Sequence, residues 1–325
     1  MSSPRLSPIG IPQLLTLAGL AASSGPNPSL LRWIAVRPRF EQFNRELALT
    51  ARQEIDAWTK WTGVVSSLNR HYYDTDSRTD NSFLIGSWAK GTAGRPPRDL
   101  DLYFVLPYEV YQRFQNHLWN RQSALLQEMK GVLSVTYPET DMTADGQIVL
   151  VRFDSYNVEL VPALALTNGR YWICDTNNGG RYKETDPAAE RDHIETSDQA
   201  TNRNLRTFIR MCKAWQETCA VPIKSFHLEL IAAEFLLQSP WRWYDFFWFD
   251  WIARDFFLYL SARANSWLTV PGTGEMMYLG SEWLSRAESA HKRALNACTF
   301  EWENRVEQAG EEWQKIFGFQ IPRTA

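Results

Sequence analysis

The first half of the chain alternates between helical and strand-like patterns of hydrophobic residues. Apolar side chains recur at spacings of three and four from Phe40 to Val65, which predicts an amphipathic helix of about 30 residues. Such a helix is long enough to span the whole molecule as a spine. A second helical pattern covers residues 108–132. Period-two patterns predict strands at residues 80–86, 99–107, 146–153 and 156–165. This mixture of strands and helices predicts an α+β unit.

The second half of the chain is almost entirely helical in pattern. Asp186-Pro187 is typical of a helix start, because aspartate caps the helix and proline suits its first position. Helices are predicted at residues 198–219, 224–238, 241–263 and 280–317. The segment 241–251 carries eight aromatic residues in eleven positions. At helical spacing these rings point in many directions, so most are expected to form core between helices rather than to stack on bases.

Composition narrows the classes of function. The 325 residues include 34 lysines and arginines against 37 aspartates and glutamates, a formal net charge of −3. Polymeric nucleic acids are bound through clustered lysine and arginine, so this balance disfavours a DNA- or RNA-coating protein. The 15 tryptophans must mostly be buried or stacked on something flat. The four cysteines form no CxxC pair, which favours free thiols over a zinc site.

Length and pattern together predict two lobes. We expect an irregular arm at residues 1–35, an α+β core with the spine helix at residues 36–196, and a helical lobe at residues 197–325. No run reaches the ~18 apolar residues of a membrane span. The apolar run Ile11–Ala22 contains a proline and is preceded by only one positive residue, so a cleaved signal peptide is not expected. A cytoplasmic location is predicted.

A glycine-serine pair precedes two aspartates in the first half of the chain. Gly86 and Ser87 end the strand 80–86 and open a polar loop, in which glycine lets backbone N–H groups approach a phosphate and serine adds a hydroxyl donor. Asp99 and Asp101 lie at i and i+2 of the next strand, so both carboxylates point to one face. Paired carboxylates repel unless a divalent cation neutralises them, and Mg²⁺ prefers a few carboxylates plus substrate phosphates.

A third acid lies on the strand 156–165. Glu159 is flanked by apolar residues, and an isolated acid in such a strand needs a partner. Together with Asp99 and Asp101 it would complete a two-metal site. An aspartate pair alone is also typical of a solvated strand end or a Ca²⁺ loop. The glycine-serine loop and the later strand acid favour the catalytic interpretation.

These residues resemble a known family. Gly86-Ser87, Asp99-Leu-Asp101 and Glu159 resemble the motifs of the DNA polymerase β-like nucleotidyltransferases. Three later blocks resemble the bacterial cGAS/DncV-like branch, the CD-NTases of CBASS anti-phage defence: residues 157–163, 171–187 and 224–229. The resemblance covers roughly residues 36–300. It implies a polymerase β-like nucleotidyltransferase sheet lobe with a long spine helix, packed against a C-terminal helical lobe that completes the nucleotide cleft.

The resemblance also implies roles for the motif residues. Gly86 and Ser87 match the motif that grips the triphosphate of the donor nucleotide. Asp99, Asp101 and Glu159 match the triad that holds two Mg²⁺ ions, for which Mn²⁺ is a substitute.

Further residues match the family in the third acid position and in the helical lobe. The family more often has aspartate as the third acid, and Asp154 is the alternative to Glu159. Lys213 and Ser225 match residues that contact the triphosphate, and Phe226 matches an aromatic on which a base stacks. The plainer alternatives are a solvated helix lysine for Lys213, a helix N-cap for Ser225, and core packing for Phe226.

The implied activity is synthesis of a cyclic di- or trinucleotide from ATP or another NTP. A ribose hydroxyl attacks an α-phosphate in line and expels pyrophosphate, and a second round closes the ring. The alternatives are an RNA-tailing or small-molecule nucleotidyltransferase, and a catalytically silent nucleotide-binding regulator or antitoxin. The net charge disfavours polymer tailing.

The resemblance implies partners as well. A downstream CBASS effector would read the product, and an ancillary regulator or ligase would act at the C-terminus, where the tail Ile321–Ala325 looks short and exposed. The sequence shows neither the zinc insert nor the basic faces of DNA-sensing animal relatives, so direct activation by DNA is not expected.

Overall fold

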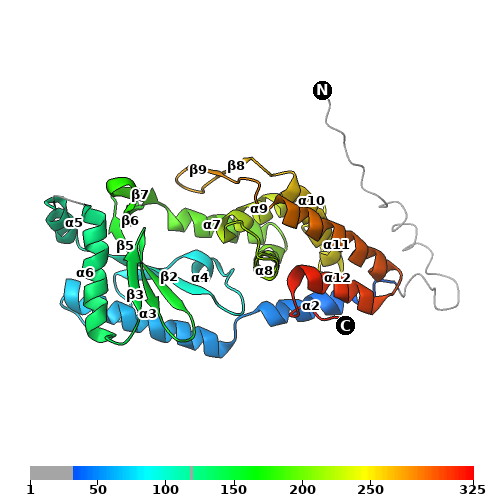
Figure 1. Cartoon of the computed structure of the whole chain (residues 1–325), viewed down its shortest axis with the longest axis horizontal. Helices are drawn as coiled ribbons and strands as arrows, with labels where there is room; N and C mark the ends of the chain where they lie inside the picture. Colours follow the sequence, from blue (N-terminus) through cyan, green and yellow to red (C-terminus); the bar gives the residue numbers. More distant parts are fainter. Residues whose placement is uncertain (1–31, 118–119) are drawn as a thin grey trace, which may run out of the picture.

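The computed structural model describes residues 32–117 and 120–325, and Figure 1 shows their arrangement. The apolar run Ile11–Ala22 and most of the predicted arm at residues 1–35 lie outside the described residues. Two large hydrophobic cores are present among the residues described, one under the sheet and one among the C-terminal helices. The expected α+β architecture with a sheet lobe and a helical lobe is confirmed. The boundaries at residues 35 and 196 stay a prediction.

Within residues 32–117 and 120–325, the sheet lobe is built on seven strands. Their bounds are β1 Ser82–Leu84, β2 Asp99–Val105, β3 Met142–Asp145, β4 Ile148–Arg152, β5 Asn157–Ala165, β6 Tyr171–Asp175 and β7 Arg181–Thr185. The order is β1-β2-β5-β4-β3, with β6 paired to the end of β5 and β7 to β6. Only β2 and β5 run parallel within this sheet. The strands predicted around β2, β4 and β5 are confirmed, whereas β3, β6 and β7 were not predicted.

Helices cover the sheet and connect its strands. They are α3 Ala51–Tyr72, α4 Gly86–Lys90, α5 Tyr108–Gln115 and α6 Arg121–Thr136. Buried residues of α3 and α6, such as Leu68 and Met129, pack with strand residues in one core. The helix predicted at residues 108–132 is wrong as a single element, because Asn120 caps a new helix by accepting from the backbone N–H of Ser123 at 3.0 Å.

The predicted spine is also two helices. The first, α2, spans Val36–Leu47, and α3 follows after a break at residues 48–50. Thr50 and Gln53 form a reciprocal capping box, with the Thr50 N–H donating to Gln53 Oε1 at 2.9 Å. This box starts α3 and therefore ends the continuous pattern. The two helices serve different cores: buried residues of α2 pack in the helical lobe, and those of α3 pack under the sheet.

The helical lobe follows the last strand of the sheet. Its elements are α7 Pro187–Gln199, α8 Asn204–Thr218, α9 Ser225–Gln238, α10 Phe249–Ser261, α11 Leu284–Trp302, α12 Val306–Phe317, and the hairpin β8 Trp267–Thr269 with β9 Met276–Tyr278. The predicted start at Asp186-Pro187 is confirmed, since Asp186 accepts from the Ala189 N–H at 2.9 Å. The predicted helix at residues 198–219 is wrong at its start, because Arg203, with a φ of 61°, interrupts it. The predicted helix at residues 280–317 is two helices, which are separated near Asn304, with a φ of 56°. None of the described helices is long and apolar enough to cross a membrane.

The aromatic segment 241–251 is mostly packed, as expected, but its first residues are not α-helical. The helix predicted at 241–263 is wrong at its start, since α10 begins at Phe249 after a short 3₁₀ turn at Phe246–Trp248. Trp241 and Phe249 are buried, and several neighbours pack against the same core. Trp243 is 57% exposed. No residue of this segment lines the cleft described below.

The C-terminal tail is less exposed than expected. Ile321 is fully buried in the helical core. The buried guanidinium of Arg39 on α2 donates to the carbonyl oxygens of Pro322 and, at 2.8 Å, of Arg323. The expectation of an exposed tail is therefore wrong for Ile321 and correct for the last three residues.

Candidate active site

The glycine-serine pair lies at the turn from β1 into α4. The expected polar loop begins instead as a five-residue helix, α4, and is non-helical from residue 92 to 98. Gly86 has a φ of +57°, and a Cβ there would lie 2.1 Å from Oδ2 of Asp101. Glycine is therefore required for two reasons: the backbone is left-handed here, and the Asp101 carboxylate leaves no room for a side chain.

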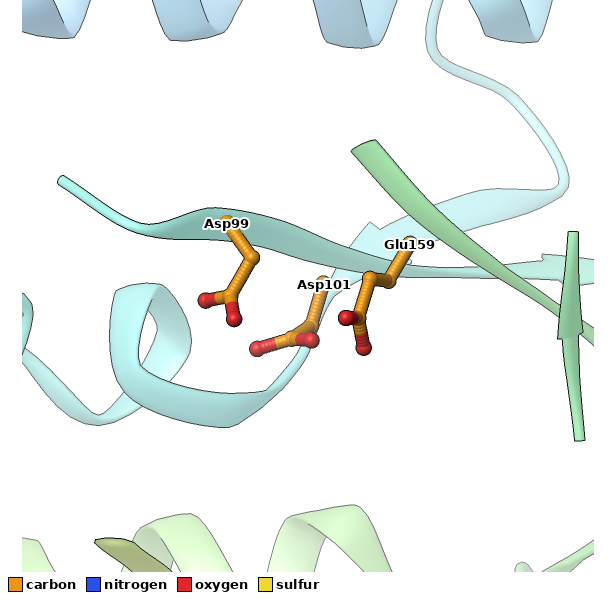
Figure 2. Close-up of side chains that lie close together, drawn as sticks. All are labelled: Asp99, Asp101 and Glu159. Atoms are coloured by element: carbon orange, nitrogen blue, oxygen red, sulfur yellow. The ribbon is translucent and has the colours of Figure 1, made fainter. Parts of the chain in front are cut away.

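The parallel pairing of β2 and β5 brings three acids together. Asp101 is directly opposite Glu159 in the register, and Asp99 lies two residues earlier on the same face of β2. Carboxylate oxygens of the three residues lie within 4.8 Å of one another, and Figure 2 shows the side chains pointing to one side of the sheet. Asp154 is exposed in the bend before β5 and is not part of this group. Glu159 is thus the acid that joins the two aspartates.

Burial dominates the electrostatics of this group, and repulsion between the carboxylates adds to it for Asp101 and Glu159. Burial raises the pKa of Asp101 to about 8, and the charges of Asp99 and Glu159 add to the rise. Burial also raises the pKa of Glu159, with a contribution from Asp99. Burial raises the pKa of Asp99 despite Lys213 and Arg98, which lower it. Three carboxylates in this arrangement suit hard divalent cations, which would favour their ionised forms.

Asp99 and Asp101 form part of one wall of a cleft of about 220 Å³ between the lobes. Gly86, Ser87 and Trp88 contribute from the sheet lobe. The opposite wall comes from the helical lobe and is partly cationic: Arg210, Lys213, Ser225, Phe226 and Glu229. An anionic ligand that carries divalent cations would therefore meet carboxylates on one side and basic groups on the other.

The predicted residues of the helical lobe all line this cleft. The side chain of Lys213 is 15% exposed and its ammonium is engaged by the protein, so it is not a solvated helix lysine. Ser225 is the first residue of α9 and its hydroxyl donates to Gln216 Oε1 at 2.8 Å; the N-cap is Lys224, so the N-cap alternative is wrong. Phe226 both packs against the helical core and lines the cleft, with Lys90 Nζ 4.7 Å from its ring centre.

Several charged residues of the cleft were missed from the sequence, among them Lys90 and Glu229. Lys90 ends α4, and Glu229 lies in α9, yet Lys90 Nζ is 2.5 Å from Glu229 Oε2. Both are almost fully buried. Lys90 follows the glycine-serine pair by three residues and Glu229 follows Phe226 by three, so each had a local signal. The two residues are 139 positions apart in the sequence, so their pairing could be recognised only from the fold.

Comparison with known proteins agrees with this geometry. Residues 34–198, just over half of the chain, match the family described as the Second Messenger Oligonucleotide or Dinucleotide Synthetase domain. A similar curated relative is the CBASS oligonucleotide cyclase CdnC of Escherichia coli (strain KTE188), 25% identical over 185 residues. The match covers 53% of this chain and 56% of that protein, so the chain spans about half the length of the curated relatives it matches.

Solved structures share the fold over most of the chain. CdnC of E. coli MS115-1 with ATP superposes with a TM-score of 0.63 at 19% identity, covering 89% of this chain and 99% of that one. The same CdnC in complex with a HORMA protein gives a TM-score of 0.62 at 19% identity, covering 89% and 98%. These likenesses establish the polymerase β-like CD-NTase fold. With the family match over residues 34–198, they lead to one conclusion: the chain belongs to the Second Messenger Oligonucleotide or Dinucleotide Synthetase family.

Proposed function

We propose that this protein is a nucleotidyltransferase that makes a cyclic di- or trinucleotide from ATP or another NTP. The observation that carries the proposal is the group of Asp99, Asp101 and Glu159, whose two aspartates line a cleft opposite a partly basic wall. The family match and the CD-NTase fold support the same reaction. The curated relative CdnC is described as an oligonucleotide cyclase of CBASS, and we propose the same setting for this chain.

The three carboxylates fit a site for two Mg²⁺ ions, with Mn²⁺ as a substitute. When bound, such ions stabilise the charge on the attacking and leaving oxygens of an in-line displacement. Asp99 and Asp101 would hold them from β2. Glu159, from β5, would hold them and help remove the proton of the attacking ribose hydroxyl.

The remaining cleft residues would hold the nucleotides. Gly86 and Ser87 begin α4, where the glycine brings backbone N–H groups close to the donor triphosphate and the serine adds a hydroxyl. Lys213 would attract the triphosphate by its charge from the helical lobe, and Ser225 would contribute from the same wall of the cleft. Phe226 presents a ring on which a base could stack.

Partners follow from the same proposal. The cyclic product would act on a downstream CBASS effector. A HORMA protein is bound to CdnC in a solved complex, and we propose a regulator of some kind for this chain too. A ligase acting at the C-terminus would find only the last three residues exposed, because Ile321 is buried. We expect no direct activation by DNA and a cytoplasmic location.

The test is incubation with labelled NTPs and Mg²⁺, followed by phosphatase. We expect a small phosphatase-resistant product from the wild type and none from Asp99→Ala/Asp101→Ala, with an unchanged far-UV circular dichroism spectrum. Equal product from this double variant would contradict the metal-site assignment. A ladder on added RNA would instead indicate a tailing enzyme, and nucleotide binding without turnover would indicate a silent regulator.

A further inference from the structure

Glu229 connects the two walls of the cleft through a buried carboxylate. Its side chain is 3% exposed, with Oε2 2.5 Å from Lys90 Nζ and Oε1 2.6 Å from Lys213 Nζ. The hydroxyl of Thr92 donates to the same Oε1 at 2.6 Å. Lys90 and Thr92 belong to the sheet lobe, at and just after the end of α4, whereas Lys213 and Glu229 lie on α8 and α9. One carboxylate therefore ties the turn that begins with Gly86 to the helical lobe.

A row of cations on α8 docks the same turn. Three side chains donate to three successive carbonyl oxygens: Arg206 to Lys90 O at 2.7 Å, Arg210 to Gly91 O at 3.2 Å, and Lys213 to Thr92 O at 3.2 Å. The donors are spaced by four and three residues, so they share one face of α8. The carbonyls at the end of α4 have few partners of their own and attract positive charge. The contact between lobes is therefore built on charge rather than on apolar packing.

Lys213 is held in place by this contact. Its ammonium has three N–H donors, and these meet Glu229 Oε1, Thr92 O and Thr92 Oγ1 at 2.6, 3.2 and 3.2 Å. Burial alone raises the pKa of Glu229, but Lys213 and Lys90 outweigh it and lower the pKa to about 2. The carboxylate is thus ionised at neutral pH and keeps both lysines in a fixed geometry.

We propose that Glu229 is a positioning residue for nucleotidyl transfer: by holding Lys90 and Lys213 it fixes the turn carrying Gly86 and Ser87 against the helical lobe. This inference rests on the proposed function. The two lysines and Glu229 together carry a charge of +1, and Glu229→Gln raises it to +2 beside the cleft. Greater positive charge attracts a triphosphate more strongly. In Glu229→Gln, the turn and the two lysines should therefore lose their fixed positions, which would slow turnover without weakening nucleotide binding.

The kinetic test compares wild type, Glu229→Gln and Lys90→Met/Glu229→Gln by pyrophosphate release at saturating Mg²⁺. We expect Glu229→Gln to lower kcat at least about tenfold, by the sensitivity of transfer to placement, with no rise in KM for the NTP. The double variant restores the charge of +1 but not the bridge, so its kcat should stay low. A kcat within threefold of wild type in either variant, or a loss confined to KM, would overturn the proposal.

Glu190→Gln is the matched control. Glu190 also faces Lys90, but its Oε2 lies 4.0 Å from Nζ and its side chain is 26% exposed, so a weaker tie is expected. Its kcat should stay within about twofold of wild type, because the Glu229 bridge is intact. Equal losses in Glu190→Gln and Glu229→Gln would mean that the bridge has no special role.

Hydrogen exchange tests the contact without any activity. In the nucleotide-free protein, amides of residues 86–92 should exchange faster in Glu229→Gln than in wild type or Glu190→Gln, while β2 stays protected. Unchanged exchange at residues 86–92 would overturn the proposal even if the enzyme is active. If the wild type makes no product, the proposed function fails, but the exchange measurement still shows whether Glu229 holds residues 86–92 in place. Should Glu229→Gln not fold, the double variant, which lacks the unpaired buried Lys90, carries the same test.

Discussion

Gly86→Ala is a sharp test of how the turn before α4 and the acid group depend on each other. The added methyl would lie 2.1 Å from Asp101 Oδ2 and 2.8 Å from its carboxyl carbon. Separations under 3.0 Å essentially never occur for real Cβ atoms, so either the turn or the Asp101 carboxylate must move by about 1 Å. The same carboxylate is opposite Glu159 in the register, and this movement would open the triad.

Two costs of this substitution can be separated. A non-glycine residue at the φ of +57° costs about 1–2 kcal/mol of folding stability. Displacing a catalytic group by about 1 Å costs activity on the order of a hundredfold. We therefore expect a protein that folds with a modestly lower urea midpoint and that releases pyrophosphate from NTPs at about 1% of the wild-type rate.

Gly146→Ala is the control that separates the cost of backbone strain from the cost of displacing the Asp101 carboxylate. Gly146 has a φ of +62° in the turn between β3 and β4, and a Cβ there meets nothing within 4 Å. This control should lose similar stability but keep its activity. A Gly86→Ala protein that retains more than a third of the wild-type rate, or a Gly146→Ala protein that loses as much activity as Gly86→Ala, would contradict this prediction.

Two further predictions concern buried charge. The pKa of Asp101 is raised from 3.8 to about 8, so the stability linked to its proton is present below about pH 4 and lost as the pH rises through about 8. Without divalent cations, the melting temperature of Asp101→Asn should exceed that of wild type by about 5 °C at pH 8.5 and by much less at pH 5. Mg²⁺ should reduce this difference in melting temperature. Thermal scans in which the difference does not depend on pH would contradict the prediction. Arg39→Met removes the guanidinium that lies 2.9 Å from buried Glu301 and leaves this carboxylate without its ion-pair partner. The free energy of unfolding, measured by urea titration, should fall by about 3–5 kcal/mol. A loss under about 1 kcal/mol would show that the ion pair contributes little.

Much of the three-acid group could be predicted because it depends on local periodicity. Asp99 and Asp101 share a face by the two-residue repeat of a strand, and Glu159 is conspicuous as a lone acid in an apolar strand. The requirement for glycine at residue 86 follows from the turn, but its contact with Asp101 needs the pairing of β1 with β2. Sequence therefore predicted which acids lie together, and the fold supplied the reason for the glycine beside them.

Other features could not be predicted because they depend on distant contacts or on how helices end. The hydrophobic pattern runs through Thr50 without interruption, and only the capping box with Gln53 shows where α3 starts. The exposed hairpin of β8 and β9 has strands of three residues each, too short for a period-two signal. The pairing of Lys90 with Glu229 crosses two lobes, and neither residue has a periodicity that indicates the other.

The mass of the product is the decisive measurement for the proposed synthesis of a cyclic nucleotide. Wild-type protein, NTPs and Mg²⁺ should yield a phosphatase-resistant species whose mass is that of two or three nucleoside monophosphates less one water for each linkage, with no terminal phosphate. The same species should be absent with Asp99→Ala/Asp101→Ala. A product that phosphatase degrades, a polymer ladder, or no product with any of the NTPs would contradict the account.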